Sequence, residues 1–94
     1  MEKRHSDTLT NRLEHILYAG CAQILWNELY HWYGVKKIAA RTWDDLADRW
    51  KEVSGGKSAL KRVESPEGIY LFEEKNIQDL AAPSQYEFMS SSDR

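Results

Sequence analysis

The sequence has one cysteine and no long hydrophobic run, and each of these shortages disfavours a class of protein. Because Cys21 is alone, no internal disulfide can form, and a secreted disulfide scaffold is not expected. No apolar run approaches the roughly 18 residues that a membrane-spanning helix needs. The polar N-terminal stretch, residues 1–12, lacks the apolar core of a signal peptide. We therefore expect a cytoplasmic protein that does not enter a membrane.

Basic residues are also too few and too evenly spread for a typical nucleic-acid binder. The chain has 13 Lys and Arg against 15 Asp and Glu, which gives a formal net charge of −2, and it has no basic block. Neutralisation of phosphates supplies most of the non-specific affinity of nucleic-acid binders. The even charge balance therefore disfavours nucleic-acid binding without excluding it.

Aromatic residues are plentiful, with four Trp, five Tyr and two Phe among 94 residues. The apolar fraction of 41% is ordinary for a globular protein, so disorder of the whole chain is not expected. A chain of this length forms one small domain whose stability depends on a few large side chains. We predict a single domain over residues 1–83 and a loose C-terminal tail over residues 84–94.

The first predicted element is a long helix, Leu9–Tyr33. Asp7, Thr8 and Thr10 offer capping side chains, apolar residues recur at helical spacing, and Gly34 supplies a stop. An apolar stripe on such a helix can bind a protein partner or pair with its own symmetry mate in a homodimer. The protein-interface prediction comprises six residues: Tyr18, Leu25, Trp26, Leu29, Trp32 and Tyr33.

The rest of the chain predicts a second helix and then a β-hairpin. The segment Thr42–Val53 has one apolar face and begins with a capping-box pattern. The stretch Ser65–Gly68 fits a turn between two strands within Ala59–Glu73. Shorter helical turns are predicted on either side of these elements, at Val35–Ala40 and Asn76–Ala82. The predicted fold class is α+β, with two main helices and a C-terminal β-hairpin, and its order is compatible with a winged-helix arrangement.

Two patterns suggest ligand chemistry, and both have a simpler interpretation. The "GGKS" of residues 55–58 looks like the end of a phosphate-binding loop, but the glycine required five residues before Gly56 is replaced by Lys51, inside a predicted helix. Glu28 and His31 form half of a di-iron carboxylate motif, and the chain has no second copy of that motif. We therefore predict no cofactor and no metal site.

Possible catalytic groups do not converge either. On one continuous helix, Cys21, His15 and His31 would not share a face. The acids Asp44, Asp45 and Asp48 fall on the polar face of a predicted helix, where an i, i+4 pair between Asp45 and Arg49 accounts for their spacing. The sequence therefore predicts no catalytic residue, and the protein is not expected to be an enzyme.

The preferred interpretation is a non-enzymatic protein-interaction module, a small intracellular regulator or inhibitor that binds a protein partner or itself. The alternative is a winged-helix transcriptional regulator in which Thr42–Val53 is the recognition helix and Val35–Ala40 the helix before it. Acids outnumber bases on the exposed face of that recognition helix, which argues against the alternative. Four cations would contact DNA in it: Arg49, Lys57, Lys61 and Arg62.

Overall fold

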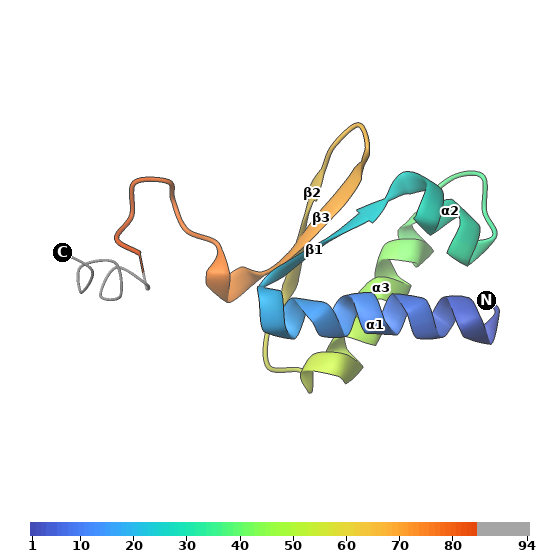
Figure 1. The fold of residues 1–94 in the computed structure, drawn as a ribbon, viewed down its shortest axis with the longest axis horizontal. Coiled ribbons are helices and arrows are strands. Elements are labelled where there is room, and N and C mark those ends of the chain that lie inside the picture. Colours follow the sequence, from blue (N-terminus) through green and yellow to red (C-terminus); the bar gives the residue numbers. More distant parts are fainter. Residues whose placement is uncertain (85–94) are drawn as a thin grey trace.

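The computed structural model describes residues 1–84, which form three α-helices, a three-stranded antiparallel sheet and one 3₁₀ turn. In chain order these are α1 (Lys3–Ala19), β1 (Cys21–Leu25), α2 (Trp26–Tyr33), α3 (Ala40–Ser54), β2 (Leu60–Glu64), β3 (Gly68–Glu73) and η1 (Glu74–Asn76). The predicted α+β class is confirmed. The strand order is β1-β3-β2, so the last strand lies between the first two (Figure 1). The predicted tail lies outside the described residues, apart from Ser84.

The predicted long helix, Leu9–Tyr33, is wrong, because the helix ends at Gly20 and a strand follows it. Gly20 adopts a left-handed conformation with φ of 85° and donates its N–H to the carbonyl of Ile16 at 2.8 Å, which ends α1. The next five residues form β1, in which Ala22 and Ile24 are buried and their neighbours are not. Apolar residues in this stretch fit a helix as well as a strand, and pairing with the distant β3 decides between them.

The core lies between the helices and one face of the sheet. The third strand passes so close to the first that a Cβ atom at Gly68 would collide with the carbonyl of Ile24, so only glycine fits there. Every helix and two of the strands contribute buried apolar side chains: Leu9, Leu13, Ile16, Ala22, Ile24, Leu29, Trp32, Leu46, Trp50, Ile69 and Leu71.

The helices begin at other residues than predicted, whereas two of them end at the predicted glycines. The first helix begins six residues before Leu9, and α3 begins at Ala40 without a side-chain cap, so both predicted capping patterns are wrong. Thr42 lies inside α3 and packs in the core. The predicted stops are confirmed, since Gly34 and Gly55 both adopt left-handed conformations at helix ends.

The two shorter helical turns are also wrong, whereas the hairpin is confirmed. No helix covers residues 35–39 or 77–82, and a 3₁₀ turn at Glu74–Asn76 follows the sheet instead. At the hairpin tip, the N–H of Ser65 donates to the carbonyl of Gly68 at 2.8 Å. None of the helices within residues 1–84 has the length and apolar character needed to cross a bilayer.

Candidate binding groove

A groove with a volume of about 720 Å³ runs between α3 and the strand β2. Its floor is apolar and partly aromatic, and comprises Trp43, Leu46, Trp50, Leu60 and Leu71. Four cations line it as well, Lys51 from α3, Lys57 from the linker before β2, and Lys61 and Arg62 from β2 itself. The groove therefore offers apolar contact in its depth and mostly positive charge along its rim, with Asp44 as an acidic exception.

The linker between α3 and β2 is fixed by hydrogen bonds from α3 and from the 3₁₀ turn η1. The indole N–H of Trp50, a residue only 2% exposed, donates to the carbonyl of Ser58 at 3.0 Å. The N–H of Glu74 donates to the carbonyl of Ala59 at 2.9 Å. Because these bonds hold the linker at both points, Lys57 is presented from an anchored segment of the groove wall.

An aromatic chain connects the groove with the hairpin tip. The guanidinium of Arg62 lies 3.9 Å from the centre of the Trp43 ring, a cation–π contact. Trp43 in turn packs edge-on against Trp26, with 6.4 Å between ring centres. The indole N–H of Trp26 donates to the carbonyl of Ser65 at 2.8 Å. The hairpin is thereby attached to α2 and α3, which fixes one wall of the groove.

Beside the groove, α3 carries a row of exposed carboxylates that we call the acidic ridge. It comprises Asp44, Asp48 and Glu52, which are four residues apart and therefore lie on one side of the helix. None of the three forms an ion pair with any residue in the described part of the chain. Negative charge on the exposed side of α3 thus runs alongside the positive rim of the groove.

Of the four predicted DNA-contacting cations, three line the groove and Arg49 does not. The Nε of Arg49 donates to Asp45 at 2.7 Å and its Nη1 donates to Ser6 at 2.8 Å, so it joins α3 to α1. The predicted pair between Asp45 and Arg49 is therefore confirmed. Asp45 also accepts a 2.7 Å hydrogen bond from the hydroxyl of Tyr33.

Two pKa shifts describe this internal network. Burial, together with the bond to Asp45, raises the pKa of Tyr33 well above its ordinary value. Burial acts to raise the pKa of Asp45, but the hydrogen bonds from Tyr33 and Arg49 outweigh it and hold that pKa below its ordinary value. Arg49 is thus bonded to Asp45 and Ser6, and 24% of its side chain remains exposed.

The six predicted interface residues do not form one stripe, because Tyr18 lies on α1, Leu25 on β1 and the other four on α2. Leu29 is fully buried and Trp32 nearly so, and both pack in the core. Tyr18 and Leu25 are exposed, at 89% and 40%. The remaining two are half-buried and hydrogen-bonded as described above: Trp26 and Tyr33.

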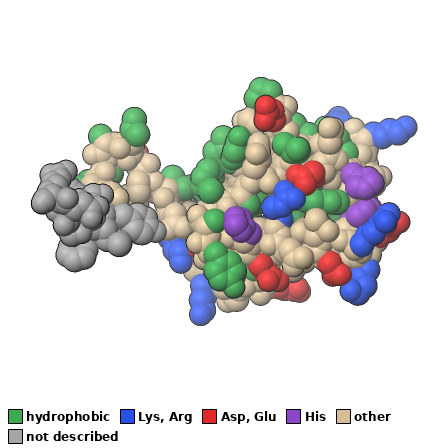
Figure 2. Space-filling model, in the orientation of Figure 1, with side chains coloured by type: hydrophobic (Ala, Val, Ile, Leu, Met, Phe, Trp, Pro, Cys, Tyr) green, Lys and Arg blue, Asp and Glu red, His purple; other side chains and the backbone are tan. Residues whose placement is uncertain are grey.

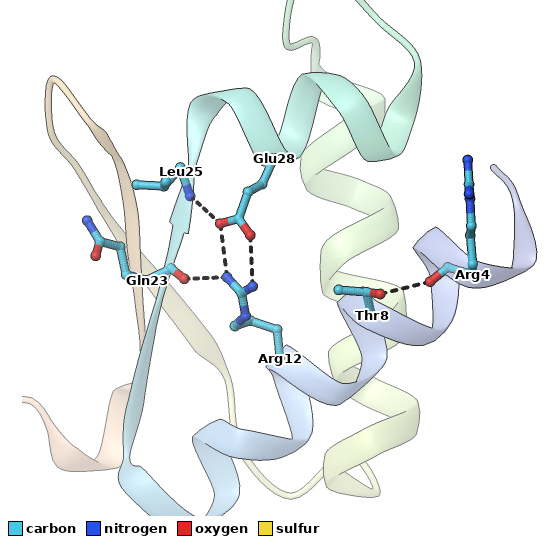
Figure 3. Close-up of polar contacts among 6 residues, drawn as sticks. All are labelled: Arg4, Thr8, Arg12, Gln23, Leu25 and Glu28. Atoms are coloured by element: carbon cyan, nitrogen blue, oxygen red, sulfur yellow. Dashed lines mark hydrogen bonds and ion pairs between the residues drawn. The ribbon is translucent and has the colours of Figure 1, made fainter.

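Glu28 has a structural partner that sequence reasoning missed. Arg12 on α1 donates from Nη1 and Nη2 to the two carboxylate oxygens of Glu28, at 3.0 and 2.8 Å (Figure 3). Arg12 also donates to the carbonyl of Gln23 at 2.8 Å, and Glu28 accepts the N–H of Leu25 at 3.0 Å. This Arg12–Glu28 clamp joins α1, β1 and α2. Its partners are 16 residues apart, so no local pattern reveals it.

The structure separates the remaining candidates for metal binding and catalysis. The ring of His31 packs against that of His5, with 4.6 Å between ring centres, while Glu28 faces Arg12. Within residues 1–84, no three His, Cys, Asp or Glu side chains gather as a metal site would require. His15 and Cys21 line one shallow hollow beside α1, an approach that a continuous helix would forbid, and no acidic residue lines that hollow with them.

Comparisons with protein-family models, with curated proteins and with solved structures found no match. Function is therefore inferred from the chemistry of this chain alone. Among its surfaces, the groove and the acidic ridge beside it combine concavity, aromatic surface and concentrated charge.

Proposed function

We propose that the chain is a non-enzymatic protein-binding domain, a small cytoplasmic regulator or inhibitor whose groove accepts an acidic segment with apolar side chains from a partner. Aromatic side chains in a concave site supply much of the binding energy of protein interfaces. The floor of the groove presents such surface at the half-buried Trp43, and the buried Trp50 supports the floor from the core. The cations at its rim favour acidic side chains on the partner and speed the encounter with it.

The acidic ridge is the observation that carries this proposal over nucleic-acid binding. A duplex in contact with α3 and β2 would bring its phosphates close to Asp44, Asp48 and Glu52, whose charge would oppose the attraction of the groove. A protein partner can place basic side chains against the ridge and acidic ones in the groove. Alternating charge of this kind suits a partner with both signs of charge and not a polyanion.

A winged-helix DNA-binding regulator is the second candidate, and the topology favours it. The order α1, β1, α2, α3, β2, β3, with β1 beside β3, is compatible with a winged-helix arrangement. In such a domain α3 would be the recognition helix and the β2–β3 hairpin the wing. Lys57, Lys61 and Arg62 would then contact phosphates beside the helix.

Selection from a displayed library of random peptides tests the first proposal. We expect the wild-type domain to enrich sequences that combine acidic and aromatic residues. The variant Lys57→Ser, Lys61→Ser should lose these peptides, because it removes charge from the rim of the groove. A matched control, Lys36→Ser, Lys37→Ser, removes two exposed lysines away from the groove and should keep them. Enriched peptides that bind the groove variant as tightly as the wild type would contradict the proposal.

A further inference from the structure

The strand β2 lies at an edge of the sheet, and four of its five residues are exposed. Its neighbour β3 pairs with one side of it, and no strand within residues 1–84 pairs with the other. Residues 61–64 are all exposed, and Val63 retains 54% of its accessible surface. An open edge presents unpaired N–H and C=O groups that can pair with another strand.

Backbone hydrogen bonds to β3 establish which groups face the open edge. The N–H of Ser65 donates to the carbonyl of Gly68, and the N–H of Glu74 donates to that of Ala59. Hydrogen-bonded pairs alternate along an antiparallel ladder, so residues 61 and 63 also bond to β3. The intervening residues direct their N–H and C=O groups away from β3, toward the open edge: Leu60, Arg62 and Glu64.

The charges on β2 favour one register for pairing with a copy of itself. Residues directly opposite each other in an antiparallel pair either both bond to the partner strand or both face away from it, so residues 60, 62 and 64 must lie opposite one another. The registers that meet this condition and pair three or more residues of each strand are centred on Lys61, Arg62 or Val63. In the first two, the central residue faces its own copy, so like charges lie opposite each other and oppose pairing. Centred on Val63, each Arg62 faces the second copy's Glu64, and two opposite-charge pairs flank the valines.

We propose that β2 pairs antiparallel with β2 of a second copy of this chain, in the register centred on Val63. Arg62 and Glu64 are the residues whose backbone groups face the open edge, so this register forms hydrogen bonds and ion pairs at the same positions. The inference goes beyond the proposed function and does not depend on it, because it rests on the open edge and the charge order of β2 and not on a ligand in the groove.

The outer face of the sheet supports the same register. Val63 lies beside Tyr70, and Tyr70 beside Gln23, whose side-chain amide donates to the tyrosine hydroxyl at 3.1 Å. Hydrophobic side chains gather over the strands on the face shown in Figure 2. In the dimer this row continues from Val63 to the second copy's Val63 and buries part of both side chains. The contact is small, so we expect a weak dimer whose population depends on concentration.

Sedimentation velocity over a concentration series, up to millimolar protein, tests the pairing. The variant Arg62→Glu has two acidic positions at the edge, and Glu64→Arg has two basic ones. Each alone places like charges opposite each other and should associate roughly tenfold more weakly than the wild type or worse. An equimolar mixture should recover wild-type association, since the acidic positions of one chain then face the basic positions of the other. Lys61→Glu is the matched control and should associate like the wild type.

Thermal unfolding of each variant confirms that it is folded, which matters because Arg62→Glu also removes the contact with Trp43. Three results would overturn the proposal: a wild-type protein that stays monomeric throughout the series, single variants that associate as strongly as the wild type, or a mixture that stays monomeric. Single variants that associate as strongly as the wild type would mean that self-association uses another surface. A monomeric wild type would mean that the open edge, if it is paired at all, pairs with a strand of a different protein.

Discussion

Replacing Arg12 with methionine tests whether the Arg12–Glu28 clamp holds the N-terminal half together. Methionine keeps an apolar stem where the arginine packs over Trp32, with 5.3 Å between the guanidinium carbon and the ring centre. The substitution removes three hydrogen bonds, two to the Glu28 carboxylate and one to the Gln23 carbonyl. Glu28 then keeps only the N–H of Leu25 as a partner among these residues.

The expected loss follows from how far the clamp is withdrawn from water. Both side chains are 28% exposed. Removing one partner of a fully buried ion pair lowers the free energy of unfolding by about 3–5 kcal/mol, and the loss for an exposed pair is less than about 1 kcal/mol. Partial exposure lets water replace some of the lost bonds, so Arg12→Met should lower the free energy of unfolding by about 2 kcal/mol. For a domain of this size that corresponds to a fall in melting temperature of about 8–16 °C.

Urea unfolding followed by tryptophan fluorescence measures this loss, and Lys3→Met provides the matched control. Lys3 pairs with Asp7 at 2.9 Å on the same helix, but both side chains are mostly exposed, so its removal should change stability very little. The double variant Arg12→Met, Glu28→Gln should lose less than the sum of the two single variants, because the partners share one interaction. An Arg12→Met variant as stable as Lys3→Met would refute the clamp.

Three further predictions concern the first turn, the linker and pH. Gly20→Ala should lower the free energy of unfolding in urea by about 1–2 kcal/mol, because alanine is strained at a φ of 85°. The loss comes from backbone strain and not from a clash, since the added Cβ would meet no backbone atom. Trp50→Phe should cost about 1 kcal/mol or more by the same assay, since it leaves the Ser58 carbonyl without its donor. The hydrogen bonds from Arg12 lower the pKa of Glu28 in the folded protein. The contribution of Glu28 to the free energy of unfolding should therefore be complete above the unfolded pKa near 4.5 and disappear as pH falls through the lower folded pKa. The variant Glu28→Gln should flatten this pH dependence of stability.

Local signals in the sequence were enough to predict α3 and the β2–β3 hairpin, although not the start of α3 or the short turns on either side of these elements. Gly34 and Gly55 stop helices, the apolar face of α3 repeats at helical spacing, and the turn at Ser65–Gly68 joins two strands, and none of these depends on distant residues. The first half was mispredicted because Cys21–Leu25 carries apolar residues that suit a helix or a strand. Its pairing with β3, nearly fifty residues later, decides the outcome.

The candidate site shows the same division between local and distant contacts. Lys57, Lys61 and Arg62 were predicted together because they follow one another closely in the sequence, and all three line the groove. Arg49 was predicted with them, but it donates a hydrogen bond to Ser6 on α1, 43 residues away in the sequence, and does not line the groove. The groove itself could not be predicted, because its floor combines α3 with the strands β2 and β3.

Binding of a fluorescent pool of random-sequence DNA duplexes, measured by anisotropy against salt concentration, tests most directly whether the groove serves a protein partner. We predict little binding by the wild type at moderate salt, and tighter binding by a variant whose acidic ridge is neutralised with Asp44→Asn, Asp48→Asn and Glu52→Gln. Tight wild-type binding that weakens steeply with salt and is lost in Lys57→Ser, Lys61→Ser would contradict the account and favour the winged-helix regulator.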